Sequence, residues 1–98
     1  MERGGYIYIL TNKNKTTLYI GVTSDLNARI QEHKSRENRN SFTYRYNLQH
    51  LVYYEILSSI EEAIEREKEL KGWVRRRKNE LINSVNPFWE DWSTKDDL

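Results

Sequence analysis

Two short aromatic strands joined by a polar turn are the feature that most constrains how this chain can fold. Residues 6–10 read YIYIL and residues 17–20 read TLYI, and both are rich in aromatic and β-branched side chains that favour strands. The residues from Thr11 to Thr16 are polar and prone to form a turn. Because so short a connection leaves no room for a crossover, it predicts an antiparallel hairpin, which Gly21 ends.

The pattern after the hairpin predicts three helical stretches and one more strand. Side-chain oxygens that can cap a helix precede two of these helices, and a glycine interrupts the later helical region. We expect a first helix that Ser24 or Asp25 caps and that ends at about Lys34 or Ser35, followed by a loop with a helical turn over 36–47. A strand is expected over His50–Leu57. The later helices are one that begins at Ile60, with Ser58 or Ser59 as its cap and a break at Gly72, and one from Val74 to about Asn83. The order β-β-α-β-α-α predicts an α/β (α+β) fold in which helices flank a small three-stranded antiparallel sheet.

Length and composition narrow the classes of protein that the chain can belong to. A chain of 98 residues accommodates one core, so we expect one domain. It contains no cysteine, which excludes disulfides and thiolate metal sites. No signal-peptide pattern opens it, and no apolar run approaches the roughly 20 residues that span a bilayer. We therefore expect a cytoplasmic protein that does not enter membranes.

The net charge of +1 hides an uneven distribution along the chain. Residues 1–89 hold 15 basic and 11 acidic side chains, whereas residues 90–98 hold four acidic side chains and one lysine. We therefore expect a domain over residues 1–89, followed by an acidic and flexible tail over residues 90–98. A moderately basic body suits nucleic-acid binding, although a solvated charged surface accounts for the same charge.

The helix after Gly21 carries two charged side chains at the border of its apolar face. At about 100° per residue, Arg29 and His33 fall on the same side as Leu26 and Ile30, which must face the core. One interpretation is that Arg29 extends from a half-buried site to solvent and that His33 lies on the surface. The other is that both side chains point into a functional cleft.

A carboxylate lies near the middle of the apolar face of the next long helix. The apolar positions are Ile60, Ala63, Ile64, Leu70 and Val74. Glu67 falls among them, where a charge is unfavourable unless it is paired or coordinates an ion. Lys71, one turn further on, can pair with Glu67 at i,i+4, which is the structural interpretation. The functional interpretation is a metal ligand or an acid–base group at the mouth of a cleft.

These residues resemble the motifs of the GIY-YIG nuclease family. Its first motif, usually Gly-Ile-Tyr, stands here as Tyr6-Ile7-Tyr8, and its second motif is Tyr19-Ile20-Gly21. Arg29 stands where the family has its catalytic arginine, and Glu67 where it has its metal-binding glutamate. The resemblance covers nearly the whole chain and is greatest with the small stand-alone bacterial members, the YhbQ-like group.

The resemblance implies a role for each side chain. Tyr8 would act as general base toward the attacking water, and Tyr19 would orient water or phosphate. Arg29 would stabilise the charge that develops on the phosphate, and His33 would position a tyrosine or the phosphate. Glu67 would bind one Mg²⁺ or Mn²⁺ ion near the leaving oxygen, and the implied products carry a 3′-hydroxyl and a 5′-phosphate. A tyrosine base requires that neighbouring cations lower its pKa from about 10.

Two departures from the family pattern concern positions near the predicted site. Tyr6 stands where the first motif usually has glycine, although Gly4 and Gly5 precede it. Some members carry an asparagine after the glutamate, for which Asn79 and Asn86 are both candidates in this chain.

Basic side chains in loops and at helix ends form a candidate rim for phosphates around the predicted site. The predicted nucleic-acid contacts are Lys13, Lys15, Gly21, Lys34, Arg36, Arg39, Arg45 and Lys71. Phe42, Tyr44 and Tyr46 are available for base stacking, and no base-reading motif is present.

The sequence therefore predicts a metal-dependent endonuclease that hydrolyses DNA in repair or processing and selects structure rather than sequence. Branched, flapped or single-stranded DNA is the expected substrate. The alternative is a nucleic-acid-binding module that needs a protein partner for targeting, because members of the resembled family usually carry a separate DNA-binding domain and none fits within 98 residues. A third interpretation is an unrelated α/β protein in which Glu67 and Lys71 form a structural pair.

Overall fold

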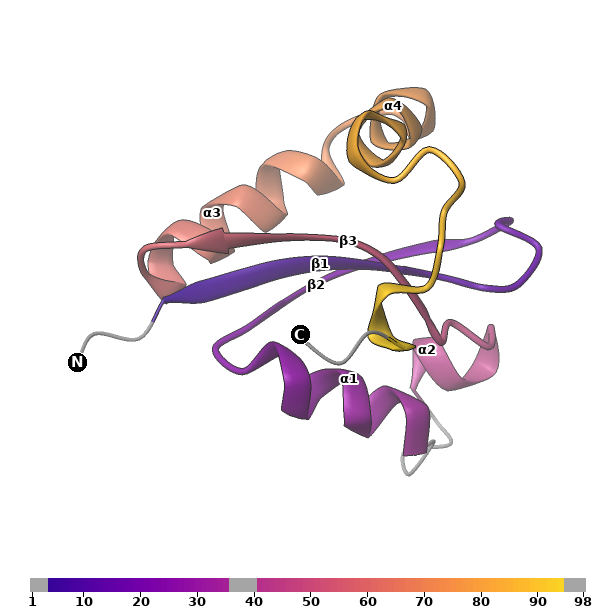
Figure 1. Cartoon of the computed structure of the whole chain (residues 1–98). Coiled ribbons are helices and arrows are strands. Elements are labelled where there is room, and N and C mark those ends of the chain that lie inside the picture. Colours follow the sequence, from indigo (N-terminus) through magenta and orange to yellow (C-terminus); the bar gives the residue numbers. More distant parts are fainter. Residues whose placement is uncertain (1–3, 36–40, 95–98) are drawn as a thin grey trace.

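The computed structural model describes residues 4–35 and 41–94, and a three-stranded antiparallel sheet lies at its centre (Figure 1). β1 (Gly5–Thr11) pairs with β2 (Leu18–Thr23) on one side and with β3 (His50–Leu57) on the other. The order β2-β1-β3 leaves β2 and β3 as the edge strands. The hairpin predicted from the polar turn is the β1–β2 pair.

Helices cover both faces of this sheet (Figure 1). On one face lie α1 (Leu26–Ser35), the short α2 (Phe42–Arg45) and the 3₁₀ turn η1 (Trp92–Thr94). On the other face lie α3 (Ile60–Lys71), which packs on β1 and β2, and α4 (Arg75–Val85). Within the described ranges, no helix is both long and apolar enough to cross a bilayer.

The element order and fold class agree with the sequence prediction. The third strand has the predicted bounds, and α1 begins after Asp25, whose carboxylate accepts a hydrogen bond from the Ala28 amide at 3.1 Å. Ser59 caps α3 by accepting from the Glu62 amide, and Gly72 ends that helix. The helical turn expected within 36–47 is α2, and the last helix runs past its predicted end to Val85.

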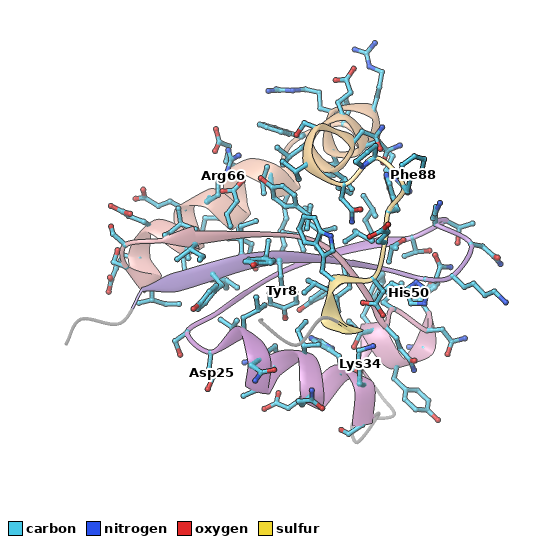
Figure 2. All side chains as sticks on the ribbon, in the orientation of Figure 1. Tyr8, Asp25, Lys34, His50, Arg66 and Phe88 are labelled. Atoms are coloured by element: carbon cyan, nitrogen blue, oxygen red, sulfur yellow. The ribbon has the colours of Figure 1, made fainter. Side chains whose placement is uncertain are left out.

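The alternation of strand side chains builds two separate cores. Odd positions of β1 face α3 and α4, whereas even positions face α1. The cluster under α3 and α4 contains Ile7, Ile9, Ile20, Val52, Tyr53, Ala63, Leu70 and Ile82. The cluster under α1 contains Tyr8, Leu10, Leu26, Ile30, Leu48 and Leu51. Figure 2 shows Tyr8 and Lys34 on the α1 side of the sheet and Arg66 on the α3 side.

The segment after α4 crosses to the α1 side of the sheet and packs against β3 (Figure 1). The Asp91 carboxylate accepts a hydrogen bond from the Leu51 amide at 3.0 Å, and the Trp92 ring meets Tyr54 edge-on at 5.8 Å. The expected flexible tail over residues 90–98 is therefore wrong for residues 90–94, because an acidic composition does not reveal that one carboxylate caps a strand end. Residues 95–98 lie outside the described residues.

Candidate active site

Tyr8 and Gly21, one from each signature motif, face each other across the β1–β2 ladder. They are direct Cα partners, and Tyr8 is fully buried. A Cβ atom on residue 21 would lie 2.8 Å from Tyr8 Cε1 and closer still to Cζ and the hydroxyl oxygen. Glycine is therefore required at residue 21 for the tyrosine ring to lie over β2. Because Gly21 is buried under this ring, it contributes space and not the nucleic-acid contact that was predicted.

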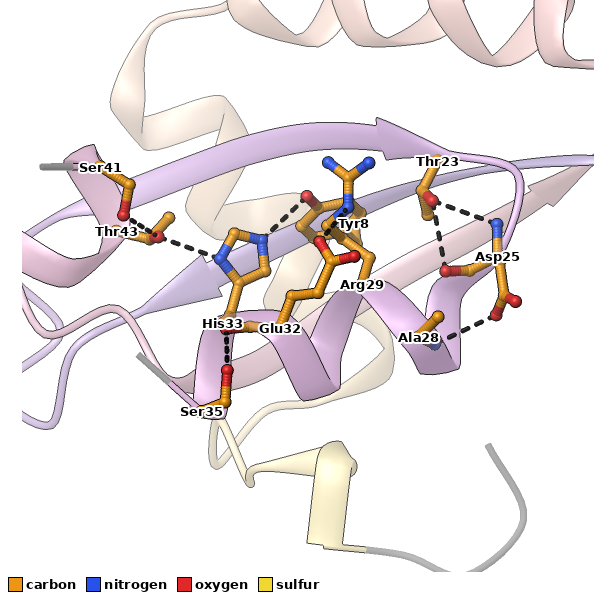
Figure 3. A network of polar contacts seen from close by, with 10 residues as sticks. All are labelled: Tyr8, Thr23, Asp25, Ala28, Arg29, Glu32, His33, Ser35, Ser41 and Thr43. Carbon is orange, nitrogen blue, oxygen red and sulfur yellow. Dashed lines mark hydrogen bonds and ion pairs between the residues drawn. The ribbon is translucent and has the colours of Figure 1, made fainter. Parts of the chain in front are cut away.

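The Tyr8 hydroxyl begins a chain of polar contacts that runs through α1 to α2 (Figure 3). It lies 3.1 Å from His33 Nε2, and His33 Nδ1 lies 2.9 Å from Thr43 Oγ1. Thr43 Oγ1 in turn lies 3.2 Å from Ser41 Oγ. A neutral imidazole with its hydrogen on Nδ1 satisfies both contacts, because it donates to Thr43 and accepts from Tyr8.

Burial sets the protonation states of this chain. It raises the pKa of Tyr8, and the neighbouring Tyr19 raises it further, while Arg29 acts in the opposite direction. Burial also lowers the pKa of His33, and Arg29 lowers it further. Tyr8 is therefore a neutral phenol at physiological pH and His33 a neutral imidazole. The condition for a tyrosinate base, a pKa lowered by neighbouring cations, is therefore not met at Tyr8, because desolvation outweighs the arginine.

A hollow of about 280 Å³ opens beside this chain. Its lining residues are Tyr19, Arg29, Glu32, His33, Ser41, Phe42, Thr43 and Tyr44. The rings of Tyr8, Tyr19 and His33 lie within 6.1 Å of one another, centroid to centroid. Tyr8 forms the buried layer beneath the half-buried Tyr19 and His33. The structure thus brings together four of the five predicted catalytic residues.

Arg29 supplies the positive charge of this hollow. Its Nε lies 3.2 Å from Glu32 Oε2, and the two side chains are 41% and 64% exposed. An ion pair this exposed is worth at most about 1 kcal/mol. A phosphate could therefore replace Glu32 as the partner of the guanidinium, which can bind two phosphate oxygens at once.

Glu67, the fifth predicted catalytic residue, comes from α3 on the other side of the sheet. Its carboxylate lies 3.4 Å from Lys71 Nζ, which is the pair anticipated by the structural interpretation. Ala63 and Leu70 are buried on either side of it, but Ile64 and Val74 are 37% and 62% exposed, so the apolar face of α3 is narrower than predicted. Glu67 itself is mostly buried, with a side chain 16% exposed.

The donors around Glu67 limit the kind of metal that it could hold. Within the described residues, no group of three or more His, Cys, Asp or Glu side chains could enclose an ion. A single carboxylate fits Mg²⁺ or Mn²⁺, which keep most of their waters and need few protein ligands. In the structure the Glu67 carboxylate is paired with the Lys71 ammonium, so a bound metal ion would take the place of one positive charge beside another.

The other predicted phosphate contacts fall into three groups. Lys13 and Lys15 are exposed in the β1–β2 turn, and Arg45 is exposed in α2, but none of them lines the hollow. Lys34 is held by Asp91 at 3.2 Å, so it is a structural cation and not a free phosphate contact. The predictions for Arg36 and Arg39 lie outside the described residues.

The two candidate asparagines both serve the fold. Asn79 accepts a hydrogen bond from Arg75, whose guanidinium also binds the backbone of the β1–β2 turn. Asn86 is buried and donates to the Val52 and Glu90 carbonyls.

Tyr6 packs in the same cluster as Tyr8, as expected for a shared strand face. Gly5 instead lies tight against the start of α3, where an added Cβ would be 2.8 Å from Ile60 Cα.

Sequence reasoning missed Thr43, which is buried and bonded to His33. Its signal was the Ser41-Phe42-Thr43 stretch, since the Ser41 hydroxyl accepts from the Tyr44 amide and caps α2 at that point. A cap this local predicts a helical turn, but it does not reveal the contact from residue 43 to α1.

Comparisons with known proteins agree with this geometry. A family model described as the GIY-YIG catalytic domain matches residues 4–80. UPF0213 proteins of Staphylococcus aureus strains Mu3 and Mu50 are 35% identical over 77 residues, covering 79% of this chain and 92% of theirs. The solution NMR structure of the UPF0213 protein BH0048 from Bacillus halodurans superimposes with a TM-score of 0.57 at 30% identity, over 95% of this chain and 97% of that one.

Proposed function

This chain belongs to the GIY-YIG family of nuclease domains, and on that premise we propose that it is an endonuclease that hydrolyses phosphodiester bonds in DNA. The observation that carries the proposal is that Tyr19, Arg29 and His33 line one hollow, with the Tyr8 hydroxyl buried beneath them in contact with His33. A buried phenol bonded to a neutral imidazole, next to a guanidinium, is suited to moving a proton beside a phosphate.

The polar chain supports a proton relay in place of a tyrosinate base. Tyr8 is fully buried, so the step requires the Tyr19 ring to move aside and admit the attacking water to the Tyr8 hydroxyl. The water would then form a bond to phosphorus and pass its proton to the Tyr8 oxygen, while the Tyr8 hydroxyl proton moves to His33 Nε2. Tyr8 remains neutral throughout, which agrees with its raised pKa. The bond from phosphorus to the 3′ oxygen breaks, and that oxygen takes a proton from solvent water to leave a 3′-hydroxyl and a 5′-phosphate. The His33 imidazolium then returns its proton to solvent.

Positive charge around the phosphate would come from Arg29 on the α1 side of the sheet and from a metal ion on Glu67 on the α3 side. Arg29 would bind the non-bridging oxygens, exchanging its pair with Glu32 for one with the phosphate. Glu67 would hold a Mg²⁺ or Mn²⁺ ion, which when bound supplies positive charge to the leaving oxygen. Tyr19, which lines the hollow, would orient the water or the phosphate. The proposal extends to a structure-selective role in DNA repair or processing in the cytoplasm, on branched, flapped or single-stranded DNA.

The deciding experiment is a cleavage assay on a panel of single-stranded, flapped, branched and duplex DNA with Mg²⁺ or Mn²⁺. Wild-type protein should cut at least one substrate, and Glu67→Gln should abolish cutting without changing the melting temperature by more than a few degrees. Glu65→Gln is the matched control, because Glu65 is exposed on the same helix and should leave the activity unchanged. Equal trace activity in the wild type and in Glu67→Gln would sink the proposal.

The pH dependence provides a separate test of the relay. Because the pKa of His33 is lowered, its imidazole accepts a proton over the whole neutral range, and the rate should fall only in acid below the ordinary value of about 6.5. In His33→Gln this acid limb should vanish together with most of the activity. An unchanged acid limb in that variant would assign the titration to another group.

A nucleic-acid-binding module without activity of its own remains the second candidate, and one contact favours it. Lys71 already neutralises Glu67 at 3.4 Å, as a structural pair would. DNA binding that is salt-dependent, independent of divalent ions and unaffected by Glu67→Gln, without cleavage of any substrate, would select this alternative.

A further inference from the structure

A second hollow adjoins the candidate active site along the β2 edge. It measures about 390 Å³, and its lining residues are Leu18, Tyr19, Ile20, Phe42, Lys71 and Lys78. Tyr19 and Phe42 line both hollows, so the two meet at these rings. We call the combined feature the aromatic groove. Arg29 lies in its first part, and Lys71 and Lys78 lie in its second.

A row of aromatic rings runs past the junction of the two parts of this groove, where Tyr19 and Phe42 line both. Ring centroids follow one another from Tyr8 to Tyr19 at 6.1 Å, from Tyr19 to Phe42 at 6.1 Å, and from Phe42 to Tyr46 at 4.6 Å. Burial decreases along this row: Tyr8 is fully buried, whereas Phe42 is 46% and Tyr46 is 50% exposed. Core packing accounts for the buried end, but it does not account for two adjacent rings that are half open to solvent.

The charges of the groove suit a polyanion. The Lys71 side chain is 55% exposed beside its contact with Glu67, and no acidic side chain of the described segments pairs with Lys78. At the other end of the groove, Arg29 pairs with the exposed Glu32. A row of cations flanking aromatic rings is the arrangement by which proteins bind single strands, with phosphates on the cations and bases on the rings.

We propose that the aromatic groove binds an unpaired nucleotide next to the scissile phosphate, with its base stacked on Phe42 and Tyr46 and its phosphate on Lys78 and Lys71. This inference deepens the proposed function and rests on it, because the phosphate next to the nucleotide is scissile only if the protein is a nuclease. The base must be unpaired, because the flat face of a base inside a duplex is already covered by its neighbours. Single strands and the unpaired arms of flaps are the substrate class that follows.

Binding can be measured without cleavage, in full-length protein without divalent ions. The probe is an oligodeoxythymidylate carrying one 2-aminopurine, whose fluorescence is quenched when the base stacks on an aromatic ring. Phe42→Ala and Tyr46→Ala should each weaken single-strand binding about 5- to 100-fold and relieve the quenching. Phe42→Trp should restore both. Tyr46 is tested because its ring lies 4.6 Å from that of Phe42. Phe88→Ala is the matched control, since Phe88 is 79% exposed on the segment after α4, lines neither hollow and makes none of the ring contacts found among the described residues.

Salt dependence tests the phosphate contact separately. Lys78→Gln should lower the slope of log affinity against log salt by about one unit, while leaving the quenching intact. Lys68→Gln, on the exposed side of α3, should leave the slope unchanged. Equal affinity of the wild type and Phe42→Ala for the single strand would overturn the inference, and so would tighter binding of blunt duplex.

Two outcomes separate this inference from the proposed function. Quenching that depends on Phe42, in a protein that cuts nothing, supports the groove and rejects the nuclease. Cleavage with the same preference for unpaired strands in Phe42→Ala as in the wild type rejects the groove and keeps the nuclease. Sedimentation of the wild type and of Phe42→Ala tests whether a second copy of this chain occupies the groove. A wild-type dimer that dissociates in Phe42→Ala would assign this surface to self-association and overturn the inference.

Discussion

The two faces of the sheet are built from one set of strands and yet differ in kind. On the α3 side, Ile7 and Ile9 join aliphatic neighbours in a core closed by Leu70 and Ile82. On the α1 side, Tyr8 lies between them along β1 and leads into hydroxyl and imidazole groups beside an open hollow. The α3 face therefore mainly stabilises the domain and contributes Glu67 alone to the proposed site, whereas the α1 face holds the other reactive groups at a fixed geometry.

The charged groups on the two sides differ in the same way. On the α3 side, Arg66 binds both Glu55 oxygens at 2.9 Å and lies 5.4 Å from the Trp73 ring, so its hydrogen-bonding groups are committed to the fold. On the α1 side, Arg29 holds one exposed glutamate. Among the described residues, every buried side-chain nitrogen and oxygen has a partner. The reactive face is therefore polar without leaving buried groups unsatisfied.

The largest effect is expected from Tyr8→Phe, which removes one oxygen from the α1 side. Loss of the relay should lower kcat about 10²- to 10⁴-fold. The free energy of unfolding should fall by only about 1 kcal/mol, because a single hydrogen bond is lost and the ring remains. Single-turnover cleavage and urea denaturation measure the two quantities. If the activity of Tyr8→Phe falls only in proportion to its folded fraction, the α1 face contributes stability like the α3 face, and the contrast between the two is wrong.

The reverse pattern is expected from Leu70→Ala on the α3 side. Leu70 is fully buried, and its truncation should lower the free energy of unfolding by about 2–5 kcal/mol. At temperatures where the variant stays folded, kcat should remain within a few-fold of the wild type. Ile64→Ala is the control, because Ile64 is 37% exposed on the same helix and should cost less. A kcat that collapses in folded Leu70→Ala would mean that the two faces are coupled.

Gly21→Ala should affect both stability and activity, because the added methyl group collides with Tyr8. Overpacking a buried ring should lower the free energy of unfolding by about 1–3 kcal/mol, and the displaced hydroxyl should lose its contact with His33. Gly72→Ala is the control: residue 72 has φ −79°, and its nearest new contact would be an ordinary 3.4 Å. That change should be neutral or slightly stabilising. Wild-type stability in Gly21→Ala would contradict the close approach.

The smallest effect is expected at Asp91, which links the C-terminal segment to Lys34 of α1 by an ion pair. Burial of Asp91 raises its pKa, but hydrogen bonds from Ser93 and Leu51 and the Lys34 ammonium outweigh it, so the folded pKa lies below the ordinary value. The unfolded chain thus takes up the proton first, and the stability contributed by Asp91 is lost as pH falls below about 4. Asp91→Asn should lose up to about 1 kcal/mol at neutral pH and show a flatter stability profile in acid. Superimposable acid profiles of the two proteins would contradict this.

The sequence was most informative where a period or a motif repeats along one element. The strand predicted over His50–Leu57 has the bounds of β3, and the helical period placed Arg29 and His33 beside the buried Leu26 and Ile30. Contacts between elements far apart in the chain left no such trace. Asp91 was assigned to a tail because its partners, Lys34 and Leu51, come from α1 and β3. The raised pKa of Tyr8 likewise follows from burial, which composition does not report.

The contact between Tyr8 and Gly21 has a consequence for how such a site can change by mutation. A library randomised at both positions and selected for folding alone should accept alanine at residue 21 whenever residue 8 has become smaller. Selection for cleavage should reject those clones, because the compensating change removes the hydroxyl that reaches His33. Each position thus restricts the other through epistasis, so selection for cleavage should retain Tyr8 and Gly21 together.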